Sequence, residues 1–149
     1  MDIHTLERMS RPELEALYRD TPLGPRPEGV FDGVLLQWLD TPGARHPFFR
    51  ATEWFAFELL CWGIRFHRSR WWFLRSCIAM GRFDATPGPS RWRDTATFRL
   101  RYDDPSLPRF VRDTLYDEVK PLSPGLCLGI GGINRERGDG DHFFYALSR

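Results

Sequence analysis

Charged side chains inside apolar strand patterns are the residues of this chain that could do chemistry. Asp32 interrupts the apolar pattern that begins at Val30. Asp94 shares an alternating face with Trp92, and Arg75 has the parity of the aromatic residues before it. A charged group on an inward face is costly to bury unless it is paired, hydrogen-bonded or in a wet cavity. These side chains therefore either join strands as Asp–Arg pairs or serve as the few polar groups of an apolar ligand pocket.

A denser group of charges stands near an apolar segment. It consists of Arg112, Asp113, Asp117 and Glu118. A carboxylate whose pKa is raised in a dry pocket can transfer protons, so this group could supply a general acid or base. Nothing in the spacing demands catalysis, and a salt bridge at the rim of the fold is the simpler interpretation.

The candidate residues form two sets. The catalytic candidates are the carboxyl groups of Asp32, Asp94 and Asp113 and the imidazole of His142. The ligand-binding candidates are aromatic or basic, namely Arg75, Trp71, Phe73, Trp92, Phe98, Tyr102, Arg112 and Phe144. The polar groups of His142, Tyr102 and Tyr145 could also hydrogen-bond a ligand, although ordinary polarity at strand ends explains them too.

Motifs of several common chemistries are missing from the sequence. It contains no GxGxxG, P-loop, HExxH or GxSxG pattern, so nothing supports nucleotide binding, zincin hydrolysis or serine-elbow hydrolysis. The Gly-rich run at 129–134 fits close packing or a bulge better than phosphate binding. The four histidines lie far apart, and the three cysteines have no CxxC spacing. We therefore predict buried free thiols, no metal site and no cofactor.

Composition indicates an ordinary globular chain. Its 149 residues are 42% hydrophobic and 28% charged, which suits one domain. An aromatic content of 15% argues against a disordered or collagen-like chain. The longest apolar stretch, 54–63, contains Glu58 and is too short to span a membrane. The first residues lack the apolar core of a secretory signal, so we expect a cytoplasmic protein with no membrane association.

Basic charge is concentrated in the middle of the chain. Residues 59–112 hold eleven Arg and four Asp, a net charge of +7. Within them, four Arg alternate with aromatic residues over 65–75, as a single-stranded nucleic-acid surface requires. The sequence pI of about 7.8 is low for a nucleic-acid-binding domain. Outward Arg and inward rings on a strand explain the pattern better, so nucleic acid is not an expected partner.

Local patterns predict a helix followed by many short strands. Ser10 and Glu13 form a capping box at the start of the helix, which a Pro-rich connector follows. A second, buried helix is expected over 47–61. The predicted strands cover 30–38, 64–67, 71–83, 92–102, 109–119, 126–134 and 142–147, with a turn at 85–90. Helical spacing fits 109–119 nearly as well as strand spacing does.

These elements predict an α+β fold that is mostly β. Short connections imply antiparallel pairing, and about seven or eight strands in a chain of this size suggest a closed or nearly closed barrel. We expect a single domain over 1–149, in which 1–27 form the helix and connector and 28–149 form the barrel. The monomer or a homodimer is the expected assembly.

The second half of the chain carries a recognisable pattern. Its elements are Tyr102-Asp103, Leu107-Pro108, Val111-Arg112-Asp113, Glu118-Val119, Pro124 to Gly129 and Phe143 to Leu147, preceded by Trp62-Gly-Ile-Arg-Phe66. This pattern resembles uncharacterised small bacterial proteins associated with lipocalin-like (calycin) β-barrels. The chain differs from it at Arg65, Thr114 and Cys127. The resemblance covers roughly 28–147 and implies a barrel with an apolar ligand, but no catalytic residues.

Three functional hypotheses follow. The first is a barrel cavity that binds a small hydrophobic or amphipathic molecule, with Arg75 or Arg112 available for a ligand carboxylate. The second is an enzyme of the cyclase or isomerase type on the same barrel, using one of the candidate acids or His142. The third is a single-stranded nucleic-acid surface over 65–75.

Overall fold

The computed structural model describes residues 1–39, 61–74, 78–132 and 141–149. Its helical elements are α1 (Ile3–Glu7), α2 (Arg11–Asp20), the 3-10 helix η2 (Phe66–Arg68) and α4 (Arg109–Thr114). Its strands are β1 (Val30–Trp38), β2 (Trp62–Arg65), β3 (Arg70–Phe73), β4 (Ile78–Arg82), β5 (Asp84–Pro89), β6 (Ala96–Arg101), β7 (Tyr116–Ser123), β8 (Leu126–Gly132) and β9 (Asp141–Ser148). The helix expected over 47–61 lies almost wholly outside the described residues.

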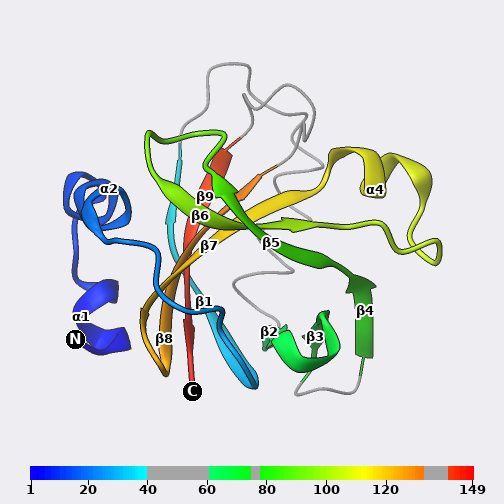
Figure 1. Ribbon diagram of the computed structural model, residues 1–149. Coiled ribbons are helices and arrows are strands. Elements are labelled where there is room, and N and C mark those ends of the chain that lie inside the picture. Colours follow the sequence, from blue (N-terminus) through cyan, green and yellow to red (C-terminus); the bar gives the residue numbers. More distant parts are fainter. Residues whose placement is uncertain (40–60, 75–77, 133–140) are drawn as a thin grey trace.

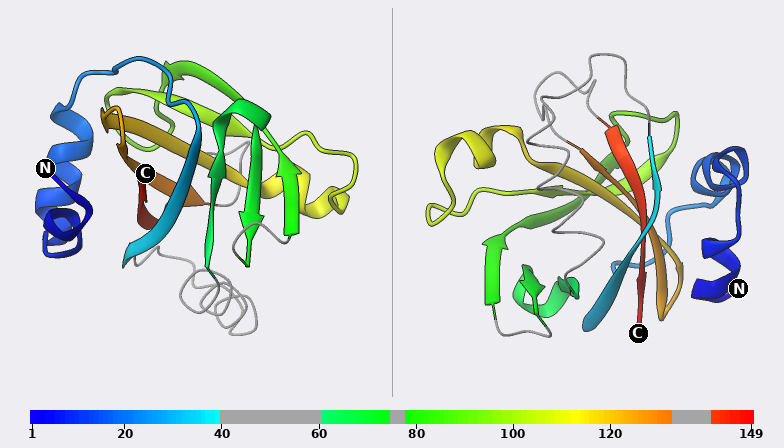
Figure 2. Two further views of the ribbon diagram at one scale, coloured as in Figure 1. Left: turned by 90° about the horizontal axis from the view of Figure 1, so that it is seen from below. Right: turned by 180° about the vertical axis from the view of Figure 1, so that it is seen from behind.

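The described strands form one antiparallel sheet that curls into a nearly closed barrel (Figures 1 and 2). The order is β4-β3-β2-β1-β9-β8-β7-β6-β5, nine strands where we expected seven or eight. The pairing of β1 with β9 joins strands from opposite ends of the chain. The two edge strands, β4 and β5, follow each other in the sequence. The mostly β, antiparallel prediction is therefore confirmed with a corrected strand count.

The sheet is apolar on both faces, because each face packs against something. Along β8, Cys127 belongs to the cluster inside the barrel, whereas Leu128 and Ile130 belong to a second cluster outside it. The outer cluster also contains Leu14 and Tyr18 of α2. The N-terminal helices lie against the barrel on this side (Figure 1). A strand with one inward and one helix-covered face reads as a continuous apolar run, as β8 does.

The predicted N-terminal helix is confirmed as α2. The carboxylate of Glu13 accepts a hydrogen bond of 2.7 Å from the backbone N–H of Ser10, as expected for the capping box. A shorter helix, α1, precedes it and was not predicted. Its start is capped by Asp2, whose side chain accepts from the backbone N–H of Thr5 at 2.9 Å. None of the described helices is long and apolar enough to cross a membrane.

Three of the predicted elements need correction. The strand expected over 71–83 is divided into β3 and β4. The turn expected at 85–90 is an edge strand, β5. Pro87 and Pro89 are tolerated there because an edge strand has a neighbour on one side only, whereas a central strand needs N–H groups for hydrogen bonds on both sides. The segment 109–119, for which we favoured a strand, contains α4 and then the start of β7. The segment fits both helical and strand spacing because a helix ends and a strand begins within it.

The alternating pattern of β6 holds only in part. Phe98, Leu100 and Tyr102 face the barrel interior and are buried, as expected. Thr97 is buried as well, because its hydroxyl lies 2.8 Å from the hydroxyl of Tyr18 on α2. The helix thus covers a face that the sequence pattern assigned to water. Asp94, expected on the inward face, is exposed in the bend before the strand.

Candidate functional site

Aromatic rings form one continuous series through the barrel interior. Adjacent ring centroids are 5.4–6.0 Å apart along the whole series. In order, the members are Trp38, Phe143, Tyr145, Trp62, Trp71, Tyr102, Phe83, Phe66 and Phe31. Most contacts are edge-to-face, but Trp62 and Trp71 are stacked with an interplanar angle of 17°. The interior is therefore a surface of ring faces and edges.

Glycines on neighbouring strands make room for the rings at the wall. Gly129 pairs with Tyr145 across the β8–β9 ladder, and a Cβ atom at Gly129 would lie 2.1 Å from Cζ of that tyrosine. Gly131 stands in the same relation to Phe143, with a closest distance of 2.4 Å. The Gly-rich run of β8 is thus explained by close packing, as the sequence indicated.

We predict that Gly129→Ala lowers the free energy of unfolding by about 1–3 kcal/mol, because the new methyl group must displace the buried ring of Tyr145. Gly24→Ala is the matched control, since the nearest atom to its Cβ would be 3.9 Å away. Urea unfolding of both variants measures the difference. Equal stability of the two variants would contradict the packing described here.

One carboxyl group lies among these rings. Asp117 on β7 is completely buried, and it stands opposite Gly131 in the β7–β8 ladder. Its Oδ2 accepts a hydrogen bond from the hydroxyl of Tyr102. Its Oδ1 is buried and finds no hydrogen-bond partner among the described residues. Because buried polar atoms in native proteins are almost always satisfied, this oxygen is the clearest functional signal in the interior.

Burial controls the ionisation of Asp117. Desolvation raises the pKa of this carboxyl to about 7, the hydrogen bond from Tyr102 lowers it, and the nearby charge of Glu118 raises it. Burial also raises the pKa of the Tyr102 and Tyr145 hydroxyls well above the usual tyrosine range. Near neutral pH, Asp117 is therefore the group in this part of the interior that can gain or lose a proton.

The adjacent Glu118 points to the opposite face of β7 and belongs to a different network. Its carboxylate accepts four hydrogen bonds of 2.5–3.1 Å. The donors are the hydroxyls of Tyr18, Ser90 and Tyr116 and the backbone N–H of Arg91. This set of contacts joins α2, the 90–95 loop and β7. Its full satisfaction marks Glu118 as a structural rather than a reactive acid.

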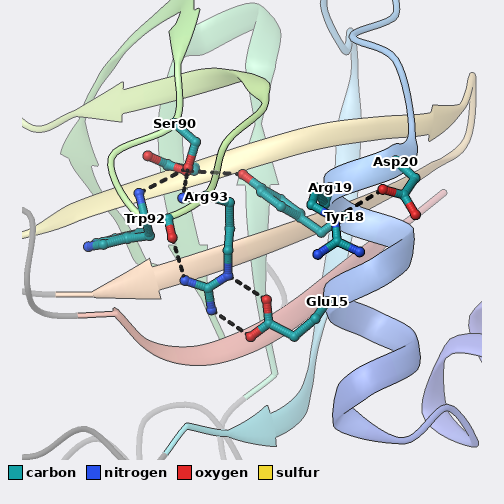
Figure 3. A network of polar contacts seen from close by, with 8 residues as sticks. Glu15, Tyr18, Arg19, Asp20, Ser90, Trp92 and Arg93 are labelled. Carbon is teal, nitrogen blue, oxygen red and sulfur yellow. Dashed lines mark hydrogen bonds and ion pairs between the residues drawn. The ribbon is translucent and has the colours of Figure 1, made fainter.

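A second tie between α2 and the 90–95 loop lies beside Glu118. Arg93 reaches the carboxylate of Glu15 with two guanidinium nitrogens, one of them at 2.6 Å (Figure 3). Lys120 is buried on the same face and donates to the backbone carbonyl of Thr21 at 2.7 Å. Burial lowers the pKa of this lysine, although Asp20 and Glu118 oppose the effect. Hydrogen bonds and an ion pair on the outer side of β7 thus connect the N-terminal helices to the barrel.

A surface pocket of about 570 Å³ lies elsewhere, near η2 and the start of β5. Its lining includes His67, Arg68 and Arg82 but also Asp84 and Asp103. It is open to solvent and has charges of both signs, so it shows no preference for one class of ligand. Across the described ranges, no three His, Cys, Asp or Glu side chains converge as metal ligands would.

Three of the ligand-binding candidates lie where the sequence placed them. Trp71, Phe98 and Tyr102 belong to the interior cluster. Trp92 and Phe144 belong to the outer cluster instead, beneath the N-terminal helices. Outward residues of β9 are as apolar as inward ones because of those helices, so the sequence could not separate the two faces.

The remaining candidates either lie outside the interior or have side chains that are not among those described. Asp32 is exposed on β1, because Phe31 rather than Val30 faces inward, so its inward placement is wrong. Asp113 is exposed on α4 and lies 3.4 Å from Arg109 as an ion pair, and Arg112 is half-buried on the same helix. Arg75 lies outside the described residues. Phe73 and His142 lie on β3 and β9, but their side chains are not described.

Two further expectations change at the level of single residues. Cys127 is buried, as predicted, and burial raises its pKa to about 12, whereas Cys61 is exposed. Cys77 lies outside the described residues. In the segment proposed for nucleic acid, Phe66, Trp71 and Trp72 are at most 4% exposed. These rings are therefore not available for stacking on bases.

The sequence did contain a signal for Asp117. In the strand interpretation of 109–119, Asp117 has the parity of Leu115 and Val119, which both pack in the interior cluster. An acid flanked at i−2 and i+2 by inward apolar residues is itself inward. We gave Asp117 a place in a charged cluster because Asp113 and Glu118 stand near it in the sequence, although β7 sends Asp117 and Glu118 to opposite faces.

Comparisons with known proteins give a fold and no family. No model of a known protein family matches the chain, and no curated protein matches it significantly. Among solved structures, it is similar to a protein from Thermomonospora curvata, with a TM-score of 0.53 and 17% sequence identity. The match covers 99% of this chain and 92% of that one. At this level of identity, the similarity concerns the nearly closed antiparallel barrel alone.

Proposed function

We propose that the barrel binds a small apolar or amphipathic molecule in its interior. The observation that carries the proposal is the buried Oδ1 of Asp117, which has no hydrogen-bond partner in the described part of a largely apolar interior. An apolar wall with few polar groups is typical of small-molecule sites, and the polar groups set the orientation of the ligand. A ligand that donates to Oδ1 would remove the cost of leaving that oxygen unsatisfied. The lipocalin-like resemblance of the sequence agrees with this function.

Binding of Nile red, a neutral apolar dye, tests the proposal. We expect saturable binding with one site per chain and quenching of tryptophan fluorescence, because Trp62 and Trp71 line the interior. Val119→Phe should weaken the binding by about tenfold or more, since Val119 is buried next to Asp117 on the inward face.

Val30→Phe is the matched control, because the same substitution at this position, 41% exposed, leaves the interior unchanged. Circular dichroism and thermal unfolding show whether each variant folds. Equal affinity of folded Val119→Phe and Val30→Phe, or no saturable binding by the native chain, would contradict the proposal. Native mass spectrometry of the purified protein adds the mass of any molecule that it retains.

A second candidate function is proton transfer on a bound apolar molecule. It is favoured by the complete burial of Asp117 among aromatic rings, which raises the pKa of the carboxyl to about 7. In this proposal Asp117 replaces the acids that we expected from the sequence, since the described positions of Asp32, Asp94 and Asp113 are exposed. Its test is activity on a bound substrate that Asp117→Asn abolishes while binding persists.

A further inference from the structure

We propose that the interior site selects an organic ammonium ion, held by Oδ1 of Asp117 at its nitrogen and by aromatic rings along its apolar part. This inference rests on the proposed function, because it names the class of molecule that the same interior takes. Three observations carry it: the unsatisfied oxygen, the charge of its surroundings and the nature of the wall.

The first observation is geometric. The carboxyl group of Asp117 is completely buried, and one of its two oxygens is already used by Tyr102. The other oxygen lies against Gly131, where a Cβ atom would be 2.8 Å from it. The space over this glycine is shared by Oδ1 and the ring of Phe143, whose Cζ would lie 2.4 Å from the same Cβ atom. The unsatisfied acceptor therefore lies at the end of β8, between Gly131 and the ring of Phe143.

The second observation concerns charge. The described groups that act on the ionisation of Asp117 are the Tyr102 hydroxyl and the carboxylate of Glu118, and neither is a cation. Tyr145 is also close, and its hydroxyl donates to the backbone carbonyl of Glu118 at 3.3 Å. A buried carboxylate without a cationic neighbour favours a ligand that brings the positive charge. A neutral alcohol could donate to Oδ1 but would leave that charge uncompensated.

The third observation is the aromatic wall next to the carboxyl group. The ring of Trp71 lies 5.8 Å from the Tyr102 ring and is stacked on Trp62. Ring faces attract cations, most strongly where water is excluded. A ligand carboxylate at this position would meet the charge of Asp117. The same interior thus attracts an ammonium ion and disfavours a carboxylate.

The test compares 2-phenylethylamine with 2-phenylethanol, which differ only in the group that would meet Oδ1. Calorimetric titration at about pH 8, where Asp117 is ionised and the amine is protonated, should show the amine binding about tenfold tighter or more. Asp117→Asn should remove this preference and leave the affinity for the alcohol within about twofold. Asp113→Asn, an exposed acid on α4, is the control and should change neither affinity.

A pH series gives a second readout that a merely structural role of Asp117 would not produce. The preference for the amine should fall between about pH 8 and pH 5, because a protonated Asp117 no longer attracts a cation. The hydroxyls of Tyr102 and Tyr145 do not contribute to this change, because burial raises the pKa of both well above the usual tyrosine range.

The two proposals fail separately. If the native protein binds Nile red in a manner sensitive to Val119→Phe but binds both phenylethyl compounds equally, or binds neither of them, the ammonium inference is overturned and the binding function stands. An amine preference that survives in Asp117→Asn overturns the inference as well. Absence of saturable binding by all three probes overturns both.

Discussion

An Asp117→Asn variant is expected to be more stable than the native protein at about pH 8 and to lose the pH dependence that the native protein shows between about pH 4 and pH 7. The folded protein holds the Asp117 proton up to a pKa of about 7, whereas the unfolded chain releases it near the model value of 3.8. Over this interval the folded state binds more protons, so the free energy of unfolding falls as pH rises. At about 1.4 kcal/mol per pKa unit, the full effect is about 4 kcal/mol.

Urea unfolding at several pH values measures this effect as the difference between the native and variant curves. The pKa of Asp104 is lowered to about 2, mainly by the hydrogen bond from the backbone N–H of Arg82, so its contribution is lost only below about pH 4. It cancels in the difference, because both proteins contain Asp104. Asp113→Asn is the control for removal of an exposed acid. Parallel native and Asp117→Asn curves would show that the carboxyl group is not desolvated as described.

Glu118→Ala is expected to lower the free energy of unfolding by about 3–5 kcal/mol, the loss typical of removing one partner of a buried charged network. Three hydroxyl groups and the backbone N–H of Arg91 lose their acceptor together. Two of the hydroxyls, those of Tyr18 and Tyr116, are buried and cannot turn to water. The loss should appear in denaturant unfolding, together with faster hydrogen exchange in α2.

Two further variants separate this network from its surroundings. Tyr18→Phe removes a single donor and should cost only about 1 kcal/mol. Glu28→Ala removes an acid that is exposed, and its effect should stay within about 0.5 kcal/mol. A Glu118→Ala variant as stable as Glu28→Ala would show that the N-terminal helices do not depend on this carboxylate.

Local signals in the sequence were sufficient for most of the elements. The capping box at Ser10 indicated the start of α2, and apolar segments bounded by turn residues located β1, β8 and β9. These features depend on residues that are close together in the chain, so they can be recognised in the sequence. The division of 71–83 was not visible, because it depends on pairing: Phe83 after β4 donates its N–H to the carbonyl of Ser69 before β3 at 2.9 Å.

The faces of the strands were harder to predict than the strands themselves. In β1, a register shift between Leu35 and Gln37 breaks the alternation, so no single parity describes the strand. In β7, six consecutive residues from Tyr116 to Pro121 are buried, three of them charged. From the sequence alone, a segment with three charged residues suggests a solvent-exposed strand. It is buried because α2 covers its outer face. Contacts between distant segments decided both cases.

The aromatic interior of the candidate site was predictable from the sequence, but its buried acid was not. The sequence indicated an aromatic interior with a few polar groups, and it named Trp71 and Tyr102 correctly as interior residues. It gave the role of the buried acid to Asp32 and Asp94, which the structure exposes. Asp32 and Asp94 drew attention because each interrupts an apolar pattern. Asp117 did not, because the charged Glu118 follows it directly in the sequence. A strand can turn two adjacent acids to different environments, and composition alone cannot show which is which.

The edge strand β5 has a consequence for the behaviour of the protein at high concentration. A barrel that does not fully close leaves backbone groups at its edges that can pair with another molecule and start aggregation. The edge on β5 reads Asp84-Ala-Thr-Pro-Gly-Pro89, and its two prolines have no N–H to offer to an incoming strand. The prolines that made this strand resemble a turn in the sequence thus leave fewer N–H groups on the β5 edge with which a second chain could pair.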